Sequence, residues 1–160
     1  MKRVLAVLVA VACAGAGASG AQDEGKPSAA DVKRGRYLVQ IAGCNDCHTP
    51  GYPESAGKVD EKVWLTGTPL GWRGPWGTTY AANLRLIAQS MTEAQWMKRV
   101  RSELRPPMPW FNVRDMSDAD ARAIYRYLKA AGPAGTPAPD YLPPDKEPKP
   151  PFVQFPAPPK

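Results

Sequence analysis

Two of the three cysteines and the only histidine of this 160-residue chain lie in one short stretch, where positions 44–48 read Cys-Asn-Asp-Cys-His. On one helical turn, Cys44 and Cys47 can each form a thioether to a vinyl group of the same haem, and His48 then follows as a ligand to the iron. This C-x-x-C-H pattern is typical of covalent c-type haem attachment. We therefore expect the chain to fold around one large, flat, apolar cofactor.

Three other uses of these residues fit less well. A zinc site usually takes four Cys or His ligands, and residues 22–160 contain only two Cys and one His. A thioredoxin-like redox pair requires a βαβ framework, and no such pattern is present. A plain disulfide between Cys44 and Cys47 would suit an oxidising compartment but leaves His48 without a role. The motif therefore favours haem c, one per chain, with His48 bound to its iron.

The second axial ligand of the iron cannot be another histidine of this chain, because His48 has no counterpart. Packing in or beside predicted helices explains three of the methionines, namely Met91, Met97 and Met116. Met108 differs because it lies in Pro-Pro-Met-Pro at 106–109, where the prolines stiffen the loop and fix the position of the thioether. We predict Met108 as the second ligand; the alternative is a loop methionine that covers apolar surface. A His/Met pair fills both axial positions and favours electron transfer over catalysis.

Three stretches of the sequence predict helices. The first spans residues 29–42, with Ser28 as its N-cap, and leads directly into Cys44. The second follows residues 90–93, Ser-Met-Thr-Glu, which fit a capping box, and it ends before the prolines at 106 and 107.

The third predicted helix begins after Ser117 and ends at Gly132. Its polar face is formed by residues that we expect to face water: Arg122, Arg126 and Lys129. No segment alternates as a half-buried strand does, and residues 71–77, rich in Gly, Pro and Trp, fit neither a regular helix nor a strand. These patterns predict an all-α fold with long irregular loops and little or no sheet.

The N-terminal residues 1–21 are typical of a signal peptide, with Lys2 and Arg3 before a short apolar run and small residues up to Ala21. Cleavage there lowers the net charge from +6 to +4, and the remaining basic residues are scattered, which argues against nucleic-acid binding. We expect a periplasmic protein whose cytochrome domain covers residues 22–132. The alternative is lipidation of Cys13, which follows a weak lipoprotein-like box and would anchor the chain to a membrane.

The C-terminal residues 133–160 contain 11 prolines in 28 positions. Proline fixes φ and lacks an amide donor, so this segment is predicted to be an extended tail. We expect it to be solvated; the alternative is that Phe152, Val153 and Phe155 hold it against the core or a partner.

From Ala30 to about Ala131 the sequence resembles class I bacterial cytochromes c, and more narrowly the haem-bearing subunits of periplasmic dehydrogenases. The matching stretches are GRYLVQIAGCNDCHTP, GPWGTTYAANL and LRPPMPWFNVRDMSDADARAIYRYL. The resemblance implies three to five helices around one haem, with the first and last helices crossing where Gly35 allows Tyr127 or its neighbours to approach. Residues 83–87, Asn-Leu-Arg-Leu-Ile, depart from the acidic sequence common in such relatives.

The resemblance also implies a function. It indicates a one-electron carrier or an electron-transfer subunit, not an enzyme, whose redox partners are a periplasmic dehydrogenase and a downstream cytochrome or oxidase. Two other interpretations are a haem-based sensor with a displaceable Met108 and an enzyme that acts on peroxide or nitrogen oxides. The single haem motif and the filled sixth position count against the enzyme.

Hydrogen-bond donors near the motif are candidates to bind the two haem propionates. These candidates are Arg73, Trp76, Tyr80 and Asn83. The alternative for each is that it only stabilises its loop. The remaining tryptophans of this region are expected to pack in the haem pocket or the core: Trp64, Trp72 and Trp110.

Overall fold

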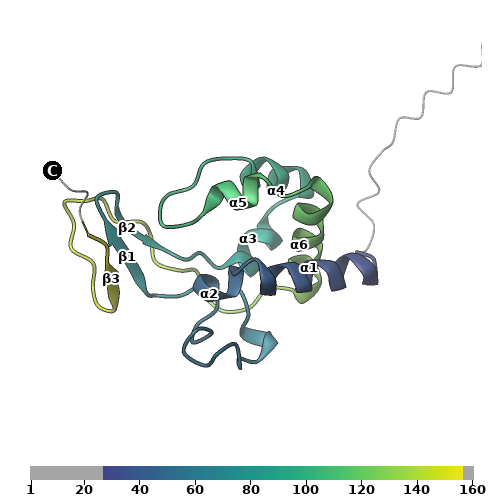
Figure 1. The fold of residues 1–160 in the computed structure, drawn as a ribbon, viewed down its shortest axis with the longest axis horizontal. Coiled ribbons are helices and arrows are strands. Elements are labelled where there is room, and N and C mark those ends of the chain that lie inside the picture. The colour runs from purple at the N-terminus through teal and green to yellow at the C-terminus, as the bar shows by residue number, and fades with distance from the viewer. Residues whose placement is uncertain (1–26, 157–160) are drawn as a thin grey trace, which may run out of the picture.

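The computed structural model describes residues 27–156, which form six α-helices, one 3₁₀-helix over Glu61–Val63 and three short strands (Figure 1). The mostly helical fold predicted from the sequence is confirmed, and it fits the small cytochrome-like fold that the resemblance implies. The helices number six, not three to five, because α3 (Leu84–Ser90) and α5 (Trp110–Arg114) add to the three predicted helices and to the expected helical turn of the motif, α2 (Cys44–His48). The predicted signal peptide and Cys13 lie outside the described residues. None of the described helices is both long enough and apolar enough to cross a membrane.

Side-chain caps set the ends of the long helices. Helix α1 (Ala29–Ile41) begins after Ser28, whose Oγ accepts a hydrogen bond from the Asp31 amide at 3.1 Å. Helix α6 (Asp118–Ala131) begins after Ser117 and ends at Gly132, whose φ of 72° suits glycine. Both helices therefore lie where their caps predicted them.

Helix α4 (Glu93–Val100) starts two residues later than a capping box over residues 90–93, with Ser90 as the N-cap, would imply. Its N-cap is Thr92, and Gln95 returns a side-chain hydrogen bond to the Thr92 amide at 2.8 Å. Ser90 instead ends α3, which is capped at its N-terminus by the Asn83 side chain. The box in the sequence therefore runs from Thr92 to Gln95, because the α3 helix occupies the residues before it.

The crossing of α1 and α6 forms the centre of the fold. A Cβ atom at Gly35 would lie 2.0 Å from the Ala123 carbonyl oxygen and 2.7 Å from the Tyr127 Cβ atom. The implied close approach at Gly35 is thus confirmed. The apolar side chains around the crossing are almost fully buried: Leu38, Val39, Ile124 and Leu128. Burial of such side chains supplies most of the stability of a domain of this size.

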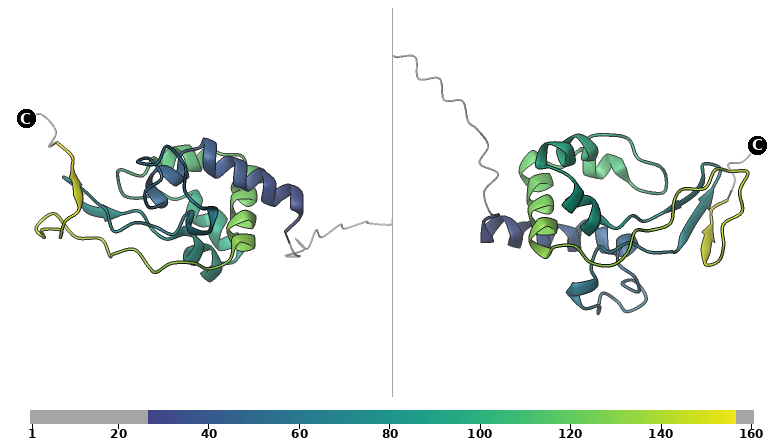
Figure 2. Two further views of the ribbon diagram at one scale, coloured as in Figure 1. Left: turned by 90° about the horizontal axis from the view of Figure 1, so that it is seen from below. Right: turned by 180° about the vertical axis from the view of Figure 1, so that it is seen from behind.

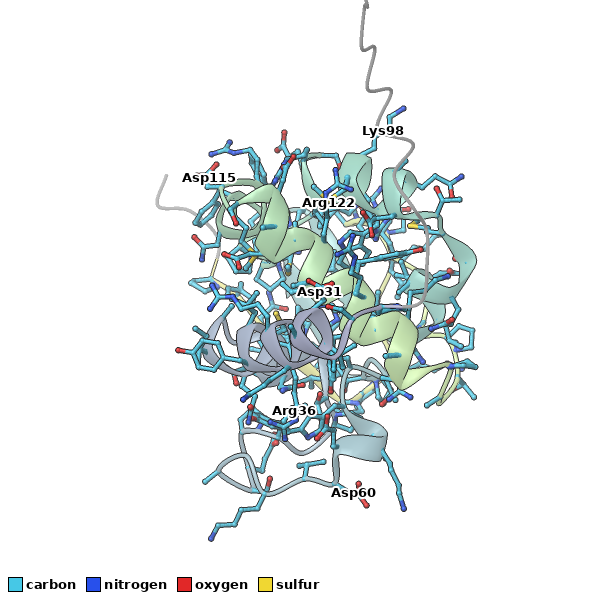
Figure 3. The ribbon with its side chains drawn as sticks, turned by 90° about the vertical axis from the view of Figure 1, so that its right-hand side faces the viewer. Asp31, Arg36, Asp60, Lys98, Asp115 and Arg122 are labelled. Carbon is cyan, nitrogen blue, oxygen red and sulfur yellow. The ribbon has the colours of Figure 1, made fainter. Side chains whose placement is uncertain are left out.

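The prediction that the polar face of α6 faces water is wrong. Arg122 and Arg126 both bind the Glu93 carboxylate of α4, and Arg126 also binds Asp31 of α1 at 2.9 Å. Lys129 is half-buried over the Tyr125 ring. Figure 3 shows Asp31 and Arg122 at this end of the molecule, where α1 and α6 cross. The neighbouring acidic side chains explain the difference, because paired guanidinium groups can be partly buried.

Residues 71–80 form a hairpin, which corrects the prediction that residues 71–77 fit no strand. Strands β1 (Gly71–Gly74) and β2 (Gly77–Tyr80) are antiparallel, with Gly74 opposite Gly77. Pro75 and Gly77 take the second and fourth places of the connecting turn, which are common positions for these residues. The same residues that argued for a loop therefore make the turn of a hairpin.

The described part of the tail is held against the hairpin through Phe152 and Phe155, as the alternative prediction had it. Val153 is exposed, however, as are most of the tail residues up to 156, in keeping with the solvated prediction. Strand β3 (Phe152–Gln154) pairs in parallel with β1, in the order β2-β1-β3. Phe155 packs against Trp76, with the ring centroids 5.3 Å apart. Both views in Figure 2 place this sheet at the opposite end of the molecule from the N-terminus of α1. The tail thus reaches across the molecule from α6 to the hairpin.

Candidate functional site

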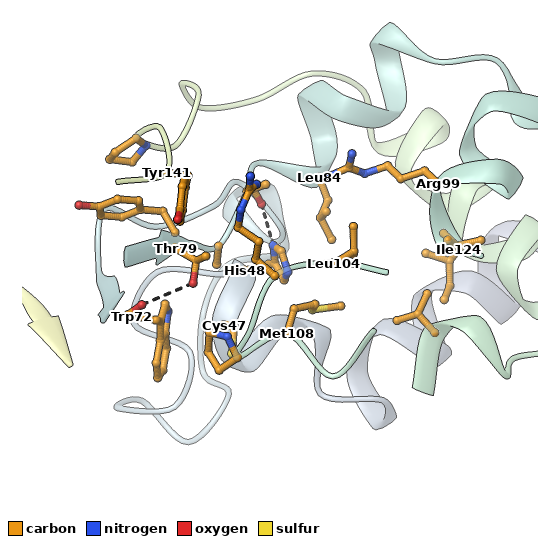
Figure 4. A pocket seen from close by; sticks show the side chains of 18 of the residues that line it. Cys47, His48, Trp72, Thr79, Leu84, Arg99, Leu104, Met108, Ile124 and Tyr141 are labelled. Carbon is orange, nitrogen blue, oxygen red and sulfur yellow. Dashed lines mark hydrogen bonds between the residues drawn. The ribbon is translucent and has the colours of Figure 1, made fainter. Parts of the chain in front are cut away.

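A cavity of about 260 Å³ lies between the helices, the hairpin and the tail (Figure 4). Its walls are mainly apolar and aromatic and come from parts of the chain that are far apart in sequence, including Trp72, Leu84, Trp96, Leu104, Ile124 and Tyr141. Cys47, His48 and Met108 line the same cavity. The structure therefore brings the predicted attachment motif and the predicted second ligand to one place.

Helix α2 positions the attachment motif. Gly43 precedes it with φ of 70°, a left-handed conformation that turns the chain sharply from α1 into α2. Asn45 is fully buried, and its side-chain oxygen accepts a hydrogen bond from the Thr49 hydroxyl at 2.7 Å. The Thr49 oxygen in turn accepts from the Leu65 amide at 2.8 Å. This buried chain of bonds fixes α2 against the rest of the fold.

His48 has one ring nitrogen fixed and the other free to bind a metal. Its Nδ1 atom lies 2.7 Å from the Ala82 carbonyl oxygen, which can only accept, so Nδ1 carries the proton. The unprotonated Nε2 then holds the lone pair that a metal requires. Burial lowers the pKa of His48 below its ordinary value. The hydrogen bond to the Ala82 carbonyl opposes this shift, and the positive charge of Arg99 adds to it. The ring is therefore neutral at physiological pH, the state in which histidine is a ligand.

Cys44 and Cys47 are both free thiols. Burial raises the pKa of Cys44 to about 11 and also raises that of Cys47. A reactive redox pair has the opposite property, because its attacking cysteine has a lowered pKa. Cys47 lines the cavity, whereas Cys44 packs beside the hydrophobic core. Two protonated thiols that do not join in a disulfide fit addition to a cofactor better than redox exchange.

Met108 lies on a loop that is held at two points. The Pro106 carbonyl accepts a hydrogen bond from the Thr79 hydroxyl of β2 at 2.6 Å. The guanidinium carbon of Arg105 lies 4.1 Å from the centroid of the Tyr141 ring, which belongs to the tail. Figure 4 shows Met108 and His48 among the side chains that line the cavity. Among the methionines in residues 27–156, Met108 alone lines this cavity.

The four candidates for propionate binding lie in different places. Tyr80 lines the cavity. Arg73 instead binds the Glu147 carboxylate of the tail through two hydrogen bonds, the longer of 2.8 Å. The Asn83 amide donates to carbonyls of the tail, the shorter bond being 2.8 Å to Ala134. The Trp76 indole N–H is buried and has no partner within the described residues. Their role toward propionates stays a prediction.

The three tryptophans that were expected to pack divide between the cavity and the core. Trp72 lines the cavity, and Trp64 is buried in the core with its indole N–H bonded to the Val59 carbonyl. Trp110 is half-buried at the start of α5, against Phe111.

Sequence reasoning missed two cations at the cavity, Arg99 and Arg105, and the wall that the tail contributes through Pro139 and Tyr141. Arg99 follows Trp96 by three positions on α4, which places both on one face of the helix. That spacing could have indicated Arg99. No local signal could have placed the tail over the cavity.

Comparison with known proteins finds two distant relatives. The chain is 29% identical over 126 residues to a nicotinate dehydrogenase subunit from Pseudomonas putida, which covers 72% of this chain and 10% of that protein. It is 28% identical over 137 residues to the cytochrome c subunit of an alcohol dehydrogenase (quinone) of Gluconobacter oxydans, which covers 78% of this chain and 26% of that subunit. The chain thus spans about a tenth and about a quarter of these relatives.

No family model matches the chain, and no solved structure is significantly similar to it. The similarity to both relatives is weak, but both relatives belong to the same class of protein, because each is a subunit of a dehydrogenase. The chain is accordingly similar, at a distance, to one dehydrogenase subunit and to the cytochrome c subunit of another dehydrogenase.

Proposed function

We propose that this chain carries one haem c, attached through Cys44 and Cys47 with His48 and Met108 as axial ligands, and that it transfers single electrons for a dehydrogenase. When bound, the haem supplies reversible one-electron exchange at its iron. The observation that carries the proposal is the neutral, oriented ring of His48, which directly follows the two thiols and shares a cavity with Met108.

The residues of the cavity fit this cofactor. The aromatic and aliphatic walls match a flat apolar ring. The Ala82 carbonyl holds the His48 ring in one orientation, and the bond makes Nε2 a better donor to iron. The bonds at Pro106 and Arg105 hold the loop that presents the Met108 sulfur. A thioether ligand raises the reduction potential, which suits a carrier that accepts electrons from a dehydrogenase.

The partner is proposed to be a dehydrogenase on the donor side, with a cytochrome or oxidase on the acceptor side. The similarity to subunits of two dehydrogenases supports the donor. The place of this exchange is proposed to be the periplasm, reached through the predicted signal peptide at residues 1–21. Lipidation at Cys13 would keep the protein at the membrane but would leave the redox role unchanged.

The proposal is tested by producing the full chain with its signal in a host that attaches c-type haem. We expect haem that stays with the polypeptide on a denaturing gel, and a ferric spectrum with a charge-transfer band from the thioether to iron. Met108→Ala should abolish that band, because alanine offers no ligand. Met116→Ala, a substitution at a methionine outside the cavity, should leave it unchanged.

Carbon monoxide distinguishes the carrier from a ligand-binding sensor. A ferrous wild-type spectrum that is indifferent to CO indicates a firmly held Met108 and supports electron transfer. A spectrum that changes with CO at neutral pH indicates a displaceable ligand, and the sensor would then be the better proposal. Protein without covalent haem, or a band that survives Met108→Ala, contradicts the assignment.

A further inference from the structure

The arginines of residues 27–156 fall into two groups. Eight of the ten donate side-chain hydrogen bonds to a carboxylate or a carbonyl: Arg34, Arg36, Arg73, Arg85, Arg101, Arg114, Arg122 and Arg126. The side chains of Arg99 and Arg105 make no hydrogen bond or ion pair with any described residue; Arg105 only stacks on Tyr141. Both of these arginines line the cavity. The two guanidinium groups without a hydrogen-bond partner in the described residues are therefore found together at the candidate site.

The cavity offers these arginines no carboxylate of the protein. No Asp or Glu is among the described residues that line it. Arg99 is half-buried, between the buried residues Trp96 and Val100 of α4, whereas Lys98 beside it is exposed. A partly desolvated guanidinium without a partner costs free energy, so its five donors favour an anion in the cavity. Figure 4 shows the Arg99 side chain extending from α4 toward Leu84.

Arg105 is held at the cavity by stacking alone. Its guanidinium carbon lies 4.1 Å from the centroid of the Tyr141 ring, and the Tyr141 hydroxyl donates to the Trp76 carbonyl at 2.8 Å. Stacking uses the face of the guanidinium plane and leaves the N–H groups at its edge free to donate. The tail therefore fixes where this positive charge lies without neutralising it.

We propose that Arg99 and Arg105 bind the carboxylates of the ligand that occupies the cavity. This inference rests on the proposed function, under which those carboxylates are the two propionates of haem. Charge-assisted bonds from guanidinium to carboxylate are stronger than neutral hydrogen bonds. Arg99 is half-buried and Arg105 is exposed, so we expect the larger contribution from Arg99. Arg73 does not compete for this role, because Glu147 already occupies its donors.

The test is the reduction potential of the haem-loaded protein and of single variants. Arg99→Gln and Arg105→Gln leave a carboxylate unpaired near the iron, which favours the more positive ferric state and lowers the potential. For Arg99→Gln we expect the equilibrium constant against a reference couple to change about tenfold, or about 59 mV for one electron. Arg99→Lys keeps the charge and should restore most of the wild-type value.

Two controls make the comparison specific. Arg34→Gln removes the same charge from an exposed ion pair with Asp120, and screening by solvent should limit its effect to less than about twofold. Arg73→Gln tests the arginine among the four candidates that the sequence indicated, and its effect should match that of Arg34→Gln. Shifts in Arg99→Gln and Arg105→Gln no larger than in these controls overturn the inference. Wild-type protein without covalent haem overturns the proposed function itself, and this inference with it.

Discussion

At the helical end of the molecule, α1, α4 and α6 each begin at a cap residue that bonds within its own first turn. At the other end, Gly71 of β1 pairs with Phe152 of β3, and Arg73 binds Glu147 across 74 residues of sequence. The first kind of contact can form as soon as its helix does, whereas the second requires the whole chain. The two ends should therefore respond differently to substitution.

The cavity lies where these two ends meet. Cys47, His48 and Arg99 come from the helical end, whereas Trp72, Tyr80 and Tyr141 come from the hairpin and the tail. Substitutions in the helical core should therefore lower the stability of the whole domain. Substitutions in the tail should instead loosen one wall of the cavity and leave the helices folded.

The largest effect is expected at the centre of the helical end, for Gly35→Ala. Alanine gains about 1 kcal/mol of helix propensity over glycine. Its Cβ atom, however, would lie 2.0 Å from the Ala123 carbonyl oxygen, and backbone cannot rotate away. We expect α1 and α6 to separate at a cost that exceeds the gain, for a net loss of about 2–3 kcal/mol. Urea unfolding followed by far-UV circular dichroism measures it.

Gly51→Ala is the matched control for that substitution. A Cβ atom there meets nothing within 4 Å, although φ of 70° is unfavourable for alanine. We expect a loss of about 1 kcal/mol from the backbone alone. If Gly35→Ala costs no more than Gly51→Ala, the two helices are not packed as closely as the crossing requires.

The same comparison explains which elements could be predicted from the sequence. Ser28 and Ser117 mark the starts of α1 and α6 correctly, because a cap acts on amides three residues away. Helix α3 was missed because its cap, Asn83, was assigned to a propionate instead. The hairpin was missed because β1 is completed by the distant tail, and the Gly and Pro of its turn were interpreted as a loop.

The residues of the candidate site also fall into those that the sequence indicates directly and those that only the folded structure reveals. The motif at 44–48 is local, so the sequence indicates it directly, and the prolines around Met108 mark the loop that the structure places at the cavity. The unpaired state of Arg99 depends on which acids lie within reach in three dimensions. The sequence indicated Arg73 as a candidate and not Arg99, and only the folded tail shows that Glu147 occupies the donors of Arg73.

A smaller and more local effect is expected at the sheet end, for Tyr141→Leu. The substitution removes the ring that stacks on Arg105 and the hydroxyl that bonds the Trp76 carbonyl. Loss of both should loosen the loop of Met108 by about 1–1.5 kcal/mol. In the ferric haem protein, added imidazole should then displace Met108 at roughly tenfold lower concentration. The unfolding of the helices should change little.

Tyr141→Phe separates the two contributions. Phenylalanine keeps the ring over Arg105 and loses only the hydrogen bond, so imidazole displacement should lie between wild type and Tyr141→Leu. Equal behaviour of all three proteins would show that the tail does not hold the Met108 loop. A large loss of helix stability in Tyr141→Leu would show that the two ends are not independent.

The smallest expected effect is a pH dependence at the helical end, at Asp31. The hydroxyl of Ser28 lowers the pKa of this carboxyl below its usual value, and Arg126 lowers it further. In the unfolded chain the Asp31 carboxyl has its ordinary pKa of 3.8, and in the fold its pKa is lower. The charged carboxylate therefore stabilises the fold at pH values above 3.8. This contribution is lost as the pH falls through the lowered pKa of the folded state. Because both Asp31 and Arg126 are about one-third exposed, we expect only a few tenths of a kcal/mol.

Asp31→Asn isolates this contribution, because asparagine can still accept a hydrogen bond from Ser28 but does not titrate in this range. Between about pH 6 and pH 3, the urea midpoint of the wild type should fall slightly more than that of Asp31→Asn. Asp145→Asn provides the control at the sheet end, since the Asp145 carboxylate lies 3.8 Å from the nearest cation and is mostly exposed. This variant should follow the wild type at every pH. The opposite result would be a fall of the urea midpoint in acid that disappears in Asp145→Asn and persists in Asp31→Asn. That result would place the acid-sensitive contacts in the tail and not at the caps of the helical end.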